Sequence, residues 1–164
     1  MTTVAPSISG VTATAILTGT FLSGGMMSLS TTCMPVFLGS IPDGAQLTRQ
    51  WLHFYRLGSR TAPPIALGTF GLYIYSALTN RAAGRPWQLL AAAGAATLSI
   101  VPYTLVAMLP TNNELERLER KGRAGEKVDP EEARGLARRW TWLHLVRSLF
   151  PLAGALLGVA STCC

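Results

Sequence analysis

Long stretches without a charged side chain constrain this sequence more than any other feature. No Asp, Glu, Lys or Arg occurs before Asp43, and after Arg139 the only one is Arg147. Two further uncharged stretches cover residues 61–80 and 86–113. A helix needs about 20 apolar residues to cross a hydrocarbon core of about 30 Å. The pattern therefore predicts four membrane spans, at about 8–38, 61–79, 87–109 and 140–160.

The composition agrees with a helical membrane protein. Hydrophobic residues make up 49% of the chain and charged residues only 13%. Backbone groups in lipid must be satisfied within each segment, and the alternation typical of barrel strands is absent. We expect an all-α fold, a four-helix transmembrane bundle that forms one domain over residues 1–164. The first stretch has no Lys or Arg and is rich in Gly, Ser and Thr, so it reads as a retained helix rather than a signal peptide.

The basic residues are spread unevenly over the connections between the predicted spans. Of 14 Lys and Arg residues, three lie between spans one and two, eight between spans three and four, and two in the opposite loop. The positive-inside rule places the first and third connections in the cytoplasm. We expect loop 111–139 to be cytoplasmic, both termini to be lumenal, and the protein to reside in the endoplasmic reticulum or a related endomembrane. This distribution also argues against nucleic-acid binding, despite the net charge of +6.

Two of the connections carry helical patterns of their own. Between spans one and two, basic residues recur at helical spacing and form one stripe, made of Arg49, His53, Arg56 and Arg60. This stripe predicts an amphipathic interfacial helix before span two, which the sequence APP then begins. After span three, Thr111 and Glu114 have capping-box spacing, and Asp129 with Pro130 is typical of a second helix start. We therefore expect a charged cytoplasmic helical hairpin between spans three and four.

Span four keeps two ionisable residues within an apolar helix. His144 and Arg147 share one helical stripe with Trp140, Gly154 and Gly158. The two glycines are spaced for close helix packing, so the stripe should face other helices, although the same face is also available to a second copy of the chain in a homo-oligomer. Ionisable residues buried at membrane depth indicate a polar pocket. The alternative is that Arg147 extends to the interface while His144 only packs.

Three sequence elements together resemble a known family. PTNNELERL at 110–118 is followed by RRWTWLHLVRSLFPLAGALLG at 138–158, and RQWLHFYRLGSRTAPPIAL follows span one. From about residue 15 to 160 the chain resembles the small four-span membrane family that contains the fungal anthrone oxygenases. The resemblance implies a monooxygenase-type oxidoreductase of aromatic polyketide biosynthesis, part of secondary metabolism. Such an enzyme oxidises an anthrone to an anthraquinone with O2, and needs no flavin or nicotinamide.

The chemistry of an anthrone suits the candidate residues. Removing a proton from the CH2 opposite the ketone gives an electron-rich anthrolate that can pass an electron directly to O2. His144 is the expected base because histidine titrates near neutrality. Arg147 is expected to stabilise the oxyanion, and Asn112 to donate a hydrogen bond. Aromatic and basic side chains are expected to bind the substrate, namely Trp140, Tyr103, His53 and Arg56.

Two other functions stay open at this level. A metal- or haem-dependent oxidase would use His144 and His53, but two histidines are few for such a site and no acidic residue in the spans adds to them. A four-span scaffold or transporter would be no enzyme, yet coupled transport usually leaves acidic residues within spans. We therefore expect no metal and no cofactor, with the anthrone, O2 and the lipid bilayer as partners, while a metal or haem is not excluded.

Overall fold

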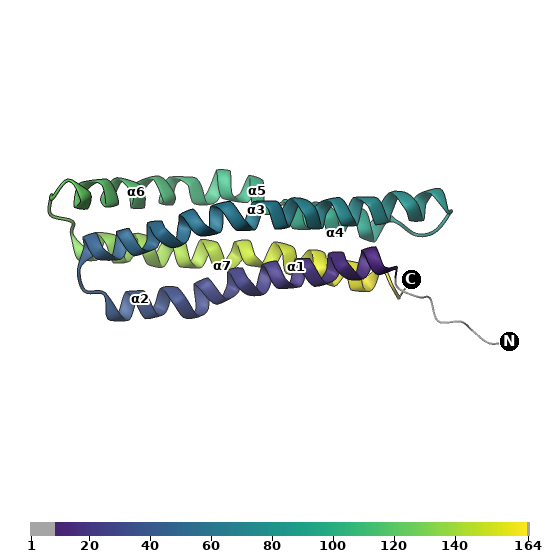
Figure 1. Ribbon diagram of the computed structural model, residues 1–164, viewed down its shortest axis with the longest axis horizontal. Helices are drawn as coiled ribbons and strands as arrows, with labels where there is room; N and C mark the ends of the chain where they lie inside the picture. The colour runs from purple at the N-terminus through teal and green to yellow at the C-terminus, as the bar shows by residue number, and fades with distance from the viewer. Residues whose placement is uncertain (1–8, 164) are drawn as a thin grey trace. The chain divides into compact units, whose positions relative to one another are not determined.

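The computed structural model describes residues 9–163, and within this range the chain is helical, without a strand. Figure 1 shows the helices in chain order. Their bounds are α1 Gly10–Ser28, the π-helical segment η1 Leu29–Cys33, α2 Met34–Ser40, α3 Gly44–Ala82, α4 Gln88–Leu98, α5 Ile100–Tyr103, the π-helical segment η2 Thr104–Met108, α6 Leu109–Arg123 and α7 Pro130–Ala160. The predicted all-α fold is confirmed for these residues. Residue 8, the predicted start of span one, lies outside them.

Three of the described helices are long and apolar enough to cross a membrane. They are Gly10–Ser40, which joins α1, η1 and α2; Gln88–Arg123, which runs from α4 to α6; and α7. Large apolar side chains are exposed along them, for example Phe21, Val106 and Leu156, at 74%, 79% and 63%. Water disfavours apolar surface of this kind, whereas lipid accommodates it. Three spans are therefore supported, and the count of four stays a prediction.

The fourth long helix, α3, differs from the expected arrangement. The amphipathic segment and predicted span two form one helix of 39 residues, so residue 61 is not a helix boundary. Pro63 and Pro64 lie inside α3. Prolines favour the first turn of a helix, which is why their position suggested a new start. Both residues are exposed, and α3 continues through them although neither ring can supply an N–H to the carbonyl four residues earlier.

The two predicted helix starts in loop 111–139 have different outcomes. Asp129 caps α7 as expected, because its Oδ1 accepts the backbone N–H of Glu131 at 3.0 Å. The capping box at Thr111 is wrong, because η2 runs directly into α6 and leaves no free helix start there. Glu114 instead accepts a hydrogen bond from Arg117 Nε at 2.7 Å. The charged helices of the loop thus continue the helices on either side.

The described chain packs as two compact units. The first unit contains residues up to Ser23, then Pro63–Ile100, and the residues from Leu149 onward; the second contains Gly24–Ala62 and Val101–Ser148. That residues 1–164 form one membrane domain stays a prediction.

Close backbone contacts hold the first unit together. Its buried cluster contains small and aromatic residues, namely Ala15, Tyr73, Ala77, Leu90 and Ala93. A Cβ atom added to Gly154 would lie 2.8 Å from the carbonyl oxygen of Ala93, and one added to Gly158 would lie 2.9 Å from the Tyr73 hydroxyl. Real Cβ atoms do not approach so closely, so a larger residue would have to displace backbone at Gly154 and the Tyr73 side chain at Gly158. The predicted close helix packing at these glycines is confirmed, and it occurs within one chain.

The second unit has a larger buried cluster, built from one face of each contributing helix. α3 supplies Leu47 and Trp51, α6 supplies Leu115 and Leu118, and α7 supplies several residues including Trp140. A Cβ atom added to Gly122 of α6 would lie only 2.7 Å from the Ala45 Cβ of α3, so the α6 backbone packs closely against Ala45. The candidate residues of span four, Trp140, His144 and Arg147, all belong to this unit.

Candidate functional site

The α7 stripe places Trp140, His144 and Arg147 together in the second unit. His144 is only 2% exposed. Its imidazole stacks on Trp140, with ring centroids 4.5 Å apart and planes inclined by 21°. The Arg147 side chain is half-buried and donates from Nη1 to Thr104 Oγ1 at 3.1 Å. Both ionisable side chains therefore interact within the protein.

His144 has a buried hydroxyl partner that the sequence did not reveal. Ser30 Oγ lies 2.9 Å from His144 Nδ1, and Ser30 is 3% exposed. The backbone of Met26, one helical turn before Ser30, also lies close to the imidazole. The first uncharged stretch contains so many serines and threonines that nothing in the sequence distinguishes Ser30 from the others.

An aromatic series leads from α3 to His144. Tyr55 stacks on Trp51 with centroids 5.1 Å apart, and Trp51 meets Trp140 edge to face at 6.0 Å. Trp140 in turn stacks on the imidazole of His144. Trp51 is fully buried. The series therefore adds Trp51 and Tyr55 to the residues around His144.

Several buried polar atoms in the second unit have no hydrogen-bond partner among the described residues. They are Trp51 Nε1, Thr111 Oγ1, Asn112 Nδ2, Asn112 Oδ1, Trp140 Nε1 and Arg147 Nε. Leaving such groups unpaired costs about 1–3 kcal/mol each. All of them except Asn112 Oδ1 can donate a proton. Together they would suit a ligand that carries several oxygen acceptors.

Asn112 belongs to the same packed region as the two tryptophans. It is 1% exposed. On α6 it is four residues from Met108 and three from Leu115, so the three side chains share one helix face. Met108 and Leu115 are members of the buried cluster that contains Trp51 and Trp140. The unpaired amide is therefore directed into the aromatic part of the second unit.

The structure places the remaining predicted residues in two different environments. Tyr103, directly before η2, is half-buried, packs against the second cluster and lies within electrostatic range of Arg147 together with Tyr55. His53 and Arg56 are exposed on α3. The structure thus brings Tyr103 to the His144 region, whereas the two basic residues of the amphipathic segment lie on the surface.

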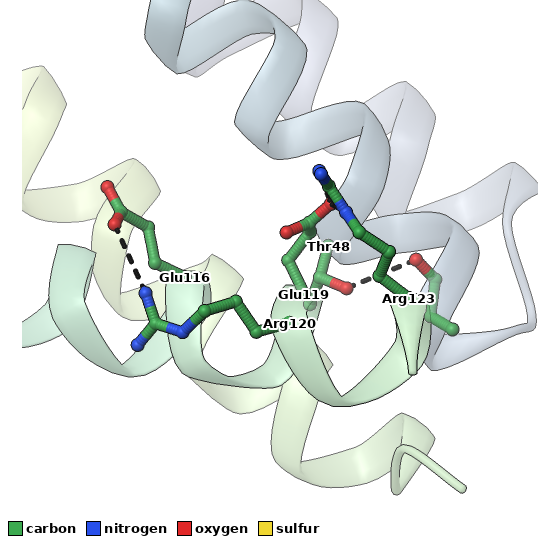
Figure 2. A network of polar contacts seen from close by, with 6 residues as sticks. Thr48, Glu116, Glu119, Arg120 and Arg123 are labelled. Carbon is green, nitrogen blue, oxygen red and sulfur yellow. Dashed lines mark hydrogen bonds and ion pairs between the residues drawn. The ribbon is translucent and has the colours of Figure 1, made fainter. Parts of the chain in front are cut away.

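Arg56 lines a separate groove of about 430 Å³. The other lining residues come from α3 and from the end of α6, namely Leu52, Glu116, Glu119, Arg120, Arg123 and Ala124. Figure 2 shows the ion pairs along α6: Arg123 Nη2 lies 2.6 Å from Glu119 Oε1, and Arg120 Nη1 lies 3.7 Å from Glu116 Oε2. The carboxylates of the groove are therefore paired with arginines of the same helix.

The described residues offer few ligands for a metal. Within residues 9–163 no group of three or more His, Cys, Asp or Glu side chains lies close enough together to hold an ion. His144 is buried beside Ser30, whereas His53 is exposed on α3. A metal or haem at the candidate site would therefore be held by one histidine of this region.

Comparisons with known proteins agree with the resemblance seen in the sequence. A family described as anthrone oxygenase matches residues 51–157. The chain is 47% identical over 149 residues to an anthrone oxygenase of Aspergillus novofumigatus, covering 90% of each protein. It is 44% identical over 155 residues to an anthrone oxygenase of Paecilomyces divaricatus, covering 93% of this chain and 94% of that protein.

A third relative has a related name. The chain is 39% identical over 150 residues to a noranthrone monooxygenase of Aspergillus flavus, covering 91% of this chain and 71% of that protein. No solved structure matches. The predicted family resemblance is confirmed. The matched segment 51–157 contains every site residue predicted from the sequence, whereas Ser30 lies before it.

Proposed function

We propose a reaction from the premise that this chain belongs to the anthrone oxygenase family and is an oxygenase. The proposed substrate is an anthrone derived from an aromatic polyketide, and the product is the anthraquinone. One oxygen atom of O2 becomes the new ketone oxygen. The other leaves as water with the two hydrogens of the substrate CH2 group. O2 is the cosubstrate, and we propose no metal and no organic cofactor.

The unpaired donors in the second unit are the observation that carries this proposal. Four N–H groups and one hydroxyl are buried there without a partner, close to two tryptophans and an aromatic series. A flat polycyclic ketone with phenolic hydroxyls would satisfy these donors through its oxygens and would pack its rings against the indoles. An aliphatic hydrocarbon would satisfy none of these donors, and a cationic ligand would offer them no acceptor.

His144 is the proposed base. Nε2 of its imidazole would remove a proton from the CH2 group, and the resulting anthrolate would transfer one electron to O2. Recombination of the radical with superoxide would form a C–O bond and give a peroxide anion, which the protonated His144 would protonate. Loss of the remaining C–H proton to the base, with cleavage of the O–O bond, then gives the ketone and hydroxide, and the protonated His144 returns that proton to the hydroxide to form water.

Arg147 and Asn112 are proposed to stabilise charge on oxygen. Arg147 Nε is buried and unpaired, while Nη1 is held by Thr104, so the guanidinium is oriented yet retains a free donor. It would bind the anthrolate oxygen, where a fixed donor in a dry site is most effective. Asn112 would donate from Nδ2 to a neighbouring substrate oxygen. Trp140 and Tyr103 would border the rings, and the exposed His53 and Arg56 would contact the substrate on its way in.

The proposed setting is a membrane with four spans, a cytoplasmic loop 111–139 and lumenal termini, in the endoplasmic reticulum or a related endomembrane. The later half of α3 would be span two and would bring the number of spans to four. It carries no charge from residue 61 to 80, and its Leu67, Tyr75 and Leu78 are exposed as lipid-facing residues would be. A flat polycyclic phenol also partitions into lipid, so a membrane site meets its substrate directly.

Isotope labelling tests the reaction. The purified protein in lipid nanodiscs should accelerate formation of anthraquinone from an anthrone well above the spontaneous air oxidation measured in empty nanodiscs. Under 18O2, one labelled atom should appear in the product ketone. Turnover that disappears on chelation and returns with a metal, or that tracks bound haem, would support the metal-dependent alternative and exclude the cofactor-free mechanism.

A further inference from the structure

We propose that Ser30 is a positioning residue, which keeps the proton of the neutral His144 imidazole on Nδ1 and so leaves Nε2 free to act as the base. The proposal rests on the proposed function of His144. Ser30 lies outside the segment matched by the family and was not expected from the sequence. It would contact no substrate atom, because its hydroxyl interacts with the ring nitrogen on the other side from the proposed basic nitrogen.

Two contacts fix the ring in place. Stacking on Trp140 at 4.5 Å restricts the plane of the imidazole, and the 2.9 Å contact with Ser30 Oγ distinguishes Nδ1 from Nε2. Neither contact alone does both, because a stacked ring can still turn over by 180°. Both partners are almost fully buried, so water does not compete for Nδ1. The tautomer of a histidine is set by the hydrogen bond that its other nitrogen makes.

The proposed direction of this hydrogen bond has Ser30 as the acceptor. Serine and threonine hydroxyls in helices commonly donate to the carbonyl four residues earlier. Two neighbours in the same long helix do so: Thr31 donates to the Met27 carbonyl at 2.9 Å and Ser40 to the Val36 carbonyl at 2.7 Å. By analogy with these neighbours, we take the Ser30 hydroxyl as the acceptor of the ring N–H, although among the described residues its one hydrogen-bond partner is His144 Nδ1.

The backbone of Met26 supports the same direction. It lies close to the imidazole, and a carbonyl oxygen can only accept a hydrogen bond. Met26 and Ser30 are four residues apart and therefore share one helix face. This face thus presents two oxygen acceptors to the imidazole. We infer that the ring points an N–H towards it, and that the N–H is the one on Nδ1.

A π-helical segment sets the position of this face. In η1 the N–H of Met34 bonds to the carbonyl of Leu29, five residues earlier. In the second such segment, η2, the N–H of Leu109 bonds to the carbonyl of Thr104, whose side chain holds Arg147. Each π-helical segment thus carries one hydroxyl that contacts one member of the His144 and Arg147 pair. Single π-helical turns often occur at functional sites, because they shift the register of the side chains that follow.

Nitrogen NMR tests the proposal without relying on activity. The chain has only two histidines, so 15N-histidine labelling in a His53→Gln background reports His144 alone. At a pH where the ring is neutral, we expect a protonated, pyrrole-type Nδ1 and an unprotonated, pyridine-type Nε2. Ser30→Ala should lower the population of this tautomer, while the remaining Met26 carbonyl keeps part of it. Thr31→Ala is the matched control, because Thr31 lies in the same segment and is exposed.

Kinetics separate this proposal from the proposed function. Ser30→Ala should lower kcat on the order of 10-fold with little change in KM, which is typical of lost support for a functional group. Ser30→Thr, which keeps the hydroxyl, should restore both the spectrum and kcat. An unchanged tautomer in Ser30→Ala, or a wild-type ring protonated on Nε2, would overturn the positioning role. A changed tautomer with unchanged turnover would confirm that role and exclude His144 as the base.

Discussion

Replacing Asn112 by leucine should make the protein more stable and less active at once. The amide is 1% exposed, and neither Nδ2 nor Oδ1 has a partner in the described chain. Each unpaired buried polar group costs about 1–3 kcal/mol. Leucine has a similar size and shape, and its neighbours on the same face, Met108 and Leu115, are already apolar. The free energy of unfolding of Asn112→Leu should therefore rise by about 1–3 kcal/mol.

The effect on catalysis should have the opposite sign. If Asn112 donates to a substrate oxygen whose charge grows in the transition state, removing it should lower kcat/KM on the order of 100-fold. Buried polar groups that weaken the fold and serve a reaction are a known form of the stability–activity trade-off. A substrate bound to the wild type should narrow the difference in stability between the two proteins, because the ligand supplies the missing partners.

The assay combines unfolding and turnover in the same lipid preparation. Thermal or denaturant unfolding would be followed by helical circular dichroism, and turnover by anthraquinone absorbance after correction for air oxidation. Asn113→Leu is the matched control: the same substitution one residue away, at an exposed position, should leave kcat/KM unchanged. A destabilised Asn112→Leu would show that the amide has partners in the folded protein, and the reasoning from unpaired groups would be refuted.

Three further predictions concern the pair, the glycine contact and the topology. His144→Ala should lose about 100-fold to 10,000-fold in turnover, and Arg147→Ala about 100-fold to 1,000-fold. The loss in the double variant should be far smaller than the product of the two single losses. Near-normal turnover of His144→Ala at normal expression would show that His144 is not the base. Gly154→Ala should destabilise the protein by about 1–3 kcal/mol because its Cβ meets the Ala93 carbonyl, whereas Gly71→Ala, with open space around it, should unfold no more easily than the wild type. Glycosylation tags should be modified at the termini but not within residues 111–139. Modification within residues 111–139 would contradict the proposed orientation.

The parts of the site that could be predicted are those that violate the pattern around them. His144 and Arg147 are ionisable residues in an apolar helix, and such residues are rare enough to attract attention. The steps of three and four along span four then placed Trp140 beside them, as the stacking confirms. The helical class followed in the same way from long uncharged stretches, which leave few alternatives in lipid.

The parts that could not be predicted depend on how helices meet. Ser30 and Thr104 are ordinary polar residues in spans that contain many others, and their role becomes visible only when α7 lies opposite them. The π-helical segments that carry them have no recognised sequence signal. The capping box at Thr111 failed for a related reason, because local spacing cannot show that η2 already supplies a continuous helix. Pro63 and Pro64 suggested a helix start near residue 61 that does not exist, because α3 continues through both prolines.

The burial of His144 also bears on the proton inventory of the proposed reaction. A CH2 group and O2 become a ketone and water without any net uptake or release of H+. A base that is 2% exposed and has no carboxylate in its own helix after the first turn can therefore complete each cycle with protons taken from the substrate itself. Such a site needs no relay of acidic residues to the aqueous phase. In the proposed membrane setting it would exchange only the anthrone, O2, the quinone and one water molecule in each cycle, and no H+.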